Sequence, residues 1–317
     1  MSESATPGAA PDPAPVSGRG GRSGSRVRSA SPATAARRPA RRRQTPDQKA
    51  RAWTKRLDRS RPGLVPFVLD GLASLHGRPI WQSRLDPISE LVLTILTQNT
   101  ADVNAERAFE ALRRAYASPP STLVVDHRRG SAAPGDSSRR PDGWGGEGLP
   151  PGRPPNWAAV EYAPVEELME VIRHGGLAYQ KAPRIQAALC TIRTTRGHYD
   201  LSFLAEMRPL DAREWLTQIP GIGKKTASIV LMFCFRMPLM PIDTHVERVS
   251  KRIGLLPADA PLDLAHELFL ELFEADQMYE AHVNLITHGR QICHARTPEC
   301  ARCPIAPRCR FVDRRAP

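Results

Sequence analysis

Apolar side chains recur at the spacing of an α-helix along most of this 317-residue chain. Convincing strand-like alternation is not found. One helical face after Asp86-Pro87 shows the pattern, and its residues are Ile88, Leu91, Val92, Ile95 and Leu96. Similar faces predict helices in the ranges 105–116, 164–172, 182–192, 211–219, 224–235, 244–253, 265–272 and 279–293. The sequence therefore predicts an all-α fold.

Three polar residues in this pattern are candidate helix starts. Asp211 is a candidate N-cap, and Thr244-x-x-Glu247 has the form of a capping box. Asp243 is an alternative N-cap for the same helix, which should stop at Gly254.

Two segments lack the large apolar residues that a core requires. Residues 1–43 are rich in Ala, Pro, Gly, Arg and Ser, and residues 118–157 are rich in Pro and Gly. We predict a disordered basic tail, over residues 1–45, and a flexible insertion within a folded domain. The start of the chain also has the composition of an organelle transit peptide, so both interpretations of it remain open.

The charge balance indicates a polyanionic partner. The chain has 45 Lys and Arg against 33 Asp and Glu, with a formal net charge of +12. Nine arginines and only two acids lie in residues 1–43, and a nucleic acid or an acidic membrane surface would suit this charge. If the partner is DNA, we expect that segment to bind it without sequence preference and with strong salt dependence. No apolar run is long enough to span a membrane, and no secretory h-region is expected.

A short turn between two predicted helices carries the motif PGIGKK, which comprises Pro220, Gly221, Ile222, Gly223, Lys224 and Lys225. The glycines permit close approach and unusual backbone angles. The turn amides and the start of the next helix would form a seat for a DNA phosphate. A simple change of chain direction is the alternative.

Lys225 is a candidate nucleophile. The positive end of the helix and the adjacent Lys224 both disfavour protonation of its amine, as nucleophilic attack requires. The alternative is a solvated, phosphate-binding lysine.

Asp243 is the second candidate for chemistry. It lies in the stretch PIDTHVERV, at or beside a helix start that favours its negative charge. Such a carboxylate can stabilise positive charge that develops on a sugar carbon. Simple helix capping is the alternative.

Four cysteines near the end of the chain form a metal-ligand pattern: Cys293, Cys300, Cys303 and Cys309. Four thiolates can hold a [4Fe–4S] cluster. Zinc is the rival, but four-cysteine zinc sites usually have two closely spaced pairs, and here only Cys300 and Cys303 form one.

Together these motifs resemble the endonuclease III family of helix-hairpin-helix DNA glycosylases. The stretches that carry the resemblance are IPGIGKKTASIVL, PIDTHVERVSKRIGL, the cysteine spacing, ELVLTILTQNTADVNAERAF and GLAYQKAPRI. It covers roughly residues 50–117 and 158–311.

The resemblance implies two lobes. A helical barrel over residues 86–237 would carry the hairpin. Residues 46–85 and 238–311 would form a second lobe with the cluster. The chain is expected to be a monomer.

The resemblance also implies the reaction. A damaged base, expected to be an oxidised pyrimidine, would be flipped from double-stranded DNA into a pocket between the lobes. Lys225 would attack C1′ and cleave an abasic strand through a Schiff base, with electrostatic help from Asp243.

The resemblance further implies a set of DNA contacts. Leu177 would act as a wedge, and Gln98 or Asn99 would fill the gap left by the flipped base. His294 and Arg296 would meet phosphates beside a structural cluster.

Two other functions remain open from the sequence. One is a monofunctional mismatch glycosylase that uses water, although such relatives typically lack lysine at the position of Lys225. The other is a non-enzymatic damaged-DNA-binding protein. The compartment is expected to be the cytoplasm or nucleoid, or an organelle or nucleus if the tail is a targeting segment.

Overall fold

The computed structural model describes residues 44–118 and 152–313. Within these ranges the chain is helical and has no β-strand, which confirms the all-α prediction. The helices are α1 (Pro46–Ser60), α2 (Leu64–His76), α3 (Pro87–Thr97), α4 (Asp102–Ala115), α5 (Trp157–Tyr162), α6 (Val165–Val171), η1 (Arg173–Gly175), α7 (Ala178–Arg196), η2 (Ser202–Glu206), α8 (Pro209–Thr217), α9 (Lys224–Phe235), α10 (Thr244–Ile253), α11 (Leu262–Leu272), α12 (Met278–Gln291), η3 (Cys300–Arg302), η4 (Ala306–Arg308) and α13 (Arg310–Asp313). No helix of the described ranges is both long and apolar enough to cross a membrane.

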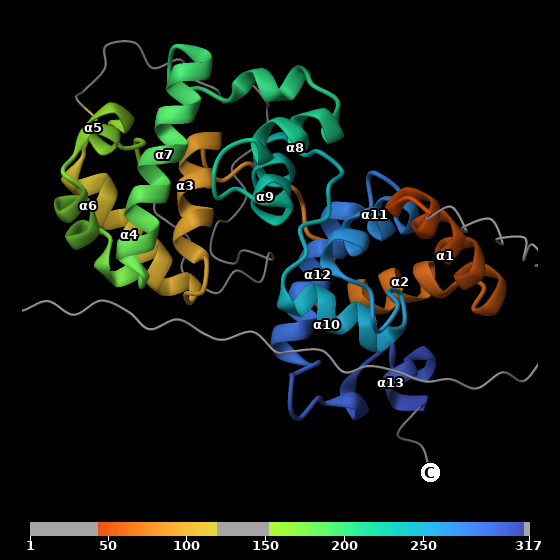
Figure 1. Cartoon of the computed structure of the whole chain (residues 1–317). Helices are drawn as coiled ribbons and strands as arrows, with labels where there is room; N and C mark the ends of the chain where they lie inside the picture. The colour runs from red at the N-terminus through yellow and green to blue at the C-terminus, as the bar shows by residue number, and fades with distance from the viewer. Residues whose placement is uncertain (1–43, 119–151, 314–317) are drawn as a thin grey trace, which may run out of the picture. The chain divides into compact units, whose positions relative to one another are not determined.

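Helices α3 to α9 enclose one hydrophobic core. Leu91 of α3, Phe109 of α4 and Leu189 of α7 are buried in it. Helix α3 packs against α4, α7 and α9, while α5 and α6 pack on α7. Figure 1 shows these helices together on the left of the view.

A second core joins the beginning of the described chain to its end. Trp53 of α1, Leu72 of α2, Phe269 of α11 and Leu285 of α12 are buried there. Helix α1 packs on α11, and α12 packs on α2 and α10. The Trp53 indole N–H also donates to the carbonyl of Leu255 at 2.8 Å, which fixes α1 to the chain after α10.

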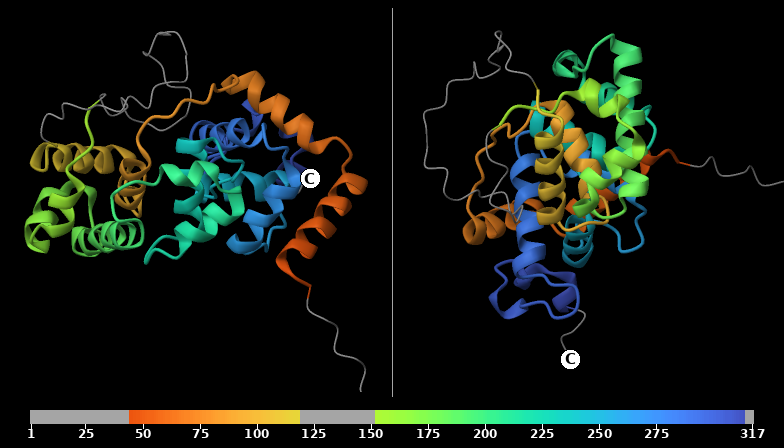
Figure 2. Two further views of the ribbon diagram at one scale, coloured as in Figure 1. Left: turned by 90° about the horizontal axis from the view of Figure 1, so that it is seen from above. Right: turned by 90° about the vertical axis from the view of Figure 1, so that its left-hand side faces the viewer.

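Helix α9 contributes to both cores. Its Val230 and Leu231 enter the first core, and its Met232 and Phe233 enter the second. A helix that is apolar around its whole circumference is expected in such a position. Figure 1 shows α9 between the other helices of the first core and the helices of the second, and Figure 2 gives two further views of the same helices.

One predicted helix start is wrong, and for a second helix the N-cap is the alternative, Asp243, rather than Thr244. Helix α8 begins at Pro209 with Arg208 as its N-cap, so Asp211 lies inside the first turn, where it pairs with Arg208 at 2.6 Å. Proline suits this first position, because its missing N–H would have no helical partner. The N-cap of α10 is Asp243, and Thr244 is its first helical residue, so no capping box forms there.

The predicted tail, residues 1–45, and the predicted insertion, residues 118–157, both extend too far into the folded part of the chain. Residues 119–151 of the predicted insertion, and residues 1–43 of the predicted tail, lie outside the described residues. The remainder is folded. Trp157 is buried in the first core, and an antiparallel bridge pairs Ala117 with Pro155. Thr45 caps α1 in a capping box with Gln48.

Because α9 serves both cores, a cavity on either side of it should weaken the whole described unit. Leu231→Ala and Met232→Ala remove buried side chains from the first and the second core, respectively. Each should lower the free energy of unfolding by about 2–5 kcal/mol. Both variants should retain a single transition in urea unfolding followed by far-UV circular dichroism.

The matched control is Leu262→Ala, which truncates an apolar side chain of α11 that is half exposed. It should change the free energy of unfolding by less than about 0.5 kcal/mol. Two separate transitions in either α9 variant would show that the cores unfold independently.

Candidate catalytic and nucleic-acid site

The PGIGKK motif forms the turn between α8 and α9, as predicted. Gly221 has φ = 83°, and a Cβ there would lie 2.8 Å from Cδ of Arg184, so this position requires glycine. Ile222 is buried and anchors the turn, while Gly221 and Gly223 are exposed. Gly223 is the N-cap of α9 and provides no side-chain acceptor, so the first-turn amides stay available to an anion.

The two lysines of the motif have different surroundings. Lys225 is exposed. Lys224 lies 3.4 Å from the carboxylate of Asp263 and 3.6 Å from that of Glu267, both on α11. The predicted phosphate contact by Lys224 therefore competes with two ion pairs.

Asp243 caps α10 through only one of its two oxygens. Oδ1 accepts hydrogen bonds from the amides of His245 at 2.9 Å and Val246 at 2.7 Å. Among the described residues Oδ2 has no hydrogen-bond partner. The capping role and a role in chemistry are therefore compatible, because each can use a different oxygen.

His282 of α12 lies within electrostatic reach of both Lys225 and Asp243. Its ring is buried and packs edge-to-face on Phe233, with ring centroids 5.8 Å apart. Burial lowers the pKa of His282 to about 4; the charge of Asp243 opposes this shift and that of Lys225 reinforces it. The Pro241 carbonyl also favours a ring proton, but no described group reaches hydrogen-bond geometry with either ring nitrogen.

The loop after α3 presents its two candidate residues differently. Gln98 Oε1 accepts a short hydrogen bond from Arg184, and its Nε2 lies 3.5 Å from Thr226 Oγ1 on α9. Asn99 is exposed and has φ = 53°. Leu177, before α7, is also partly exposed at a positive φ of 49°.

The four cysteines line one small cavity together with apolar residues of α10 and α12. Burial raises the pKa of the Cys303 thiol to about 11, and the charges of the other three cysteines add to this shift. In the described ranges, no three His, Cys, Asp or Glu side chains are arranged to hold a single metal ion. Four thiolates around one cavity are the donor set that a [4Fe–4S] cluster takes, one for each iron, so these residues fit such a cluster.

Two arginines of α10 hold the cysteine loop. Arg252 donates to the carbonyls of His294 and Ala295, each at 2.7 Å, and lies 3.3 Å from Cys293 Sγ. Arg248 donates to the carbonyl of Cys293 at 3.1 Å. The helix that Asp243 caps therefore also fixes the loop that bears Arg296, which is exposed.

Comparison with known proteins identifies the family. The family profile described as HhH-GPD superfamily base excision DNA repair protein matches residues 92–275. The chain belongs to this superfamily.

Endonuclease III proteins are among its curated relatives. The protein of Sulfolobus acidocaldarius is 35% identical over 131 residues, which cover 41% of this chain and 56% of that protein. The protein of Rickettsia felis is 42% identical over 123 residues, which cover 39% and 53%. The chain thus spans about half the length of these relatives.

A solved structure of a trapped endonuclease III–DNA covalent intermediate, in an estranged-adenine complex, shares the fold. Its TM-score is 0.58 at 24% identity, over 79% of this chain and 96% of that one. The resemblance to the endonuclease III family predicted from the sequence is confirmed.

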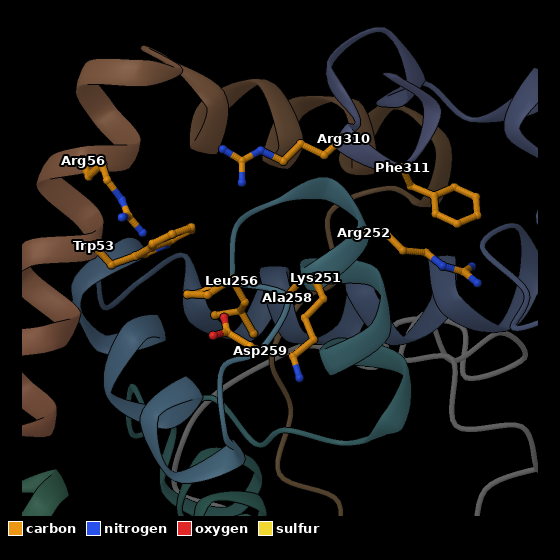
Figure 3. A pocket seen from close by; sticks show the side chains of 10 residues that line it. Trp53, Arg56, Lys251, Arg252, Leu256, Ala258, Asp259, Arg310 and Phe311 are labelled. Atoms are coloured by element: carbon orange, nitrogen blue, oxygen red, sulfur yellow. The ribbon is translucent and has the colours of Figure 1, made fainter. Parts of the chain in front are cut away.

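A cavity of about 440 Å³ in this HhH-GPD protein lies apart from Lys225 and Asp243, neither of which lines it. Figure 3 shows Trp53 and Arg56 at one end of the cavity and Arg252 and Phe311 at the other. Its walls come from α1, α10, α13 and the chain after α10. Neither candidate catalytic residue is therefore connected with this cavity.

The sequence analysis did not identify His282, Arg184 or the two arginines of α10 as parts of the site. The sequence does indicate that Arg248 and Arg252 act together, since they are four residues apart on one helical face. No such indication exists for His282 and Arg184, because their partners lie far away in the sequence.

The buried imidazole gives a testable pH dependence. The His282 pKa is about 4 in the folded protein and near 6.5 when unfolded. Only the unfolded ring takes up a proton between these values. The free energy of unfolding should therefore be highest above pH 6.5 and fall as the pH drops towards 4.

At about pH 5 this effect of His282 should amount to about 2 kcal/mol. His282→Leu should reduce the difference in urea stability between pH 7 and pH 5. Burial also lowers the pKa of His266, to about 4, so part of the difference in stability between pH 7 and pH 5 should remain. His198→Leu, at an exposed position, should leave it unchanged. An unaltered difference in the His282 variant would contradict the assignment.

Proposed function

We propose that this chain is a DNA glycosylase with AP lyase activity, which removes damaged bases, of the oxidised pyrimidine class, from double-stranded DNA. The observation that carries the proposal is the pair of side chains that this superfamily member presents at two helix starts. Lys225 is exposed in the first turn of α9. Asp243 caps α10 through one oxygen only, which leaves its second oxygen without a hydrogen-bond partner among the described residues. The covalent intermediate trapped between endonuclease III and DNA, in a protein of the same fold, supports the same chemistry.

The hairpin would seat the DNA. The exposed glycines 221 and 223 and the start of α9 offer backbone N–H groups to a phosphate. Such contacts position the duplex and carry no sequence information. Exposed Arg296, on the loop held by Arg252, would meet a second phosphate.

The chemistry would begin at the Lys225 amine, once it has lost a proton. The amine attacks C1′ of the flipped nucleotide, a new C–N bond forms, and the bond to the base breaks while the base takes up a proton. The Asp243 carboxylate stabilises the positive charge that develops on the sugar. The C1′–O4′ bond of the sugar ring then breaks, O4′ takes up a proton, and the C1′–N bond becomes the double bond of a protonated Schiff base. This Schiff base lowers the barrier to loss of a C2′ proton and to cleavage of the C3′–O bond, whose oxygen leaves with the 3′ phosphate.

The four cysteines would hold a [4Fe–4S] cluster, which would stabilise the fold around them. Cys293 and Cys309 contact Arg252 of α10, which ties the cysteine loop to the helix of Asp243. The spacing of the four cysteines along the chain favours iron–sulfur over zinc.

Asn99 would fill the gap left by the flipped base. Gln98 is already engaged by Arg184, whereas the side chain of Asn99 is exposed. Leu177 would enter the duplex from the neighbouring loop.

The first test is trapping of a covalent adduct with borohydride on a duplex that carries one abasic site. Wild type should form the adduct, and Lys225→Gln should form none, because the attacking amine is gone. Lys55→Gln, at an exposed position of α1, should trap like wild type. Undiminished trapping by Lys225→Gln would assign the nucleophile to another amine. Base release by wild type without any adduct would instead favour the monofunctional reaction.

The role of Asn99 can be separated from its backbone conformation. Asn99→Gly keeps the positive φ and removes only the side-chain amide. We expect single-turnover excision to slow by about tenfold, the effect of losing one good hydrogen bond to the orphaned base. The salt dependence of duplex binding should be unchanged, because no charge is altered. Excision at the wild-type rate would exclude Asn99 from this role.

A further inference from the structure

Lys181, in the first turns of α7, is a buried lysine whose hydrogen-bond partners are all neutral. Only 2% of its surface is exposed. Its Nζ donates to the Leu96 carbonyl at 2.6 Å, to Thr100 Oγ1 at 2.8 Å and to the Gly175 carbonyl at 2.6 Å. These three acceptors match the three N–H donors of an ammonium group.

The three acceptors lie beside two different loops. Leu96 and Thr100 flank the turn after α3, which contains Asn99, and Gly175 precedes Leu177. Thr100 also donates from Oγ1 directly to the Gly175 carbonyl at 2.5 Å. One ammonium and one hydroxyl therefore join the two loops.

The residues at the tips of these loops have unusual backbones. Asn99 has φ = 53° and Leu177 has φ = 49°, in the left-handed region that leucine strongly disfavours. Such conformations persist only where the surroundings hold them. Two of the hydrogen bonds of Lys181 go to Thr100, one residue after Asn99, and to Gly175, two residues before Leu177. They therefore restrain the backbone beside both loop tips.

We propose that Lys181 is a positioning residue, which locks the loops of Asn99 and Leu177 together so that both side chains enter the duplex as one unit. The inference rests on the proposed function. Loss of the ammonium would leave two carbonyls and a hydroxyl without their donor. Each loop could then relax separately, and Leu177 could leave its strained conformation.

Lys181 is not a rival nucleophile, although burial, with help from the charge of Arg184, lowers its pKa to about 8. The three oxygen acceptors favour its charged form, and its amine has almost no access to solvent. Of Lys181 and Lys225, Lys225 is the one that is exposed. A low pKa at position 181 therefore reflects burial of a structural ammonium.

Two substrates separate positioning from chemistry. An abasic site in a duplex requires the loops to open the helix and fill the gap, whereas an abasic site in a single strand does not. Lys181→Met should slow single-turnover incision of the duplex by at least about tenfold, because charged hydrogen bonds are lost. Incision of the single strand should stay within about twofold of wild type, since Lys225 and Asp243 are retained.

If Lys181→Met fails to fold, two variants at Thr100 test whether the hydrogen bonds between the loops position them. Thr100→Val removes the bridging hydroxyl at nearly constant shape and should show the same selective loss, whereas Thr100→Ser keeps the hydroxyl and should resemble wild type. Lys55→Met, at an exposed position of α1, controls for the lysine-to-methionine change.

Amide hydrogen exchange of the DNA-free protein gives a readout that is independent of catalysis. Residues 98–100 and 175–179 should exchange faster in Lys181→Met and Thr100→Val, and at wild-type rates in the controls. Equal loss on duplex and single strand, or wild-type exchange in both loops, would overturn the inference. If wild type incises neither substrate, the proposed function fails, and the exchange rates alone then decide whether Lys181 holds the loops.

Discussion

Burial of α9 on both sides is the constraint on which the described structure depends. Val230 and Leu231 face one core, and Met232 and Phe233 face the other. The same helix carries Lys225 at its exposed end. The helix is therefore positioned by apolar packing along its length, and its first turn stays available for a ligand.

Polar contacts then set the surroundings of that first turn. Arg184 of α7 packs against Gly221 of the hairpin and holds Gln98 of the loop after α3. Lys181, one turn earlier in α7, joins this same loop to the Gly175 carbonyl. One face of α7 thus connects three loops that are distant in the sequence. This arrangement explains how short loops can keep strained conformations at an exposed surface.

Much of the fold could be predicted, because helices depend on local patterns. The apolar period placed α9 and α3 within a residue or two of their observed bounds. Errors occurred where the local signal was ambiguous. Asp211 has a capping side chain but lies within a helix that Pro209 starts, and Trp157 belongs to the core although it adjoins a Pro- and Gly-rich stretch.

The sequence by itself determined the helical class, the hairpin turn and the group of four cysteines, because each is encoded by residues close together in the chain. Only the tertiary structure decided how the exposure and the partners of neighbouring side chains differ. Lys224 pairs with acids of α11 while Lys225 is exposed, and Gln98 is held by Arg184 while Asn99 is exposed. Burial and ion pairing depend on segments that folding brings together, so no local pattern could specify them.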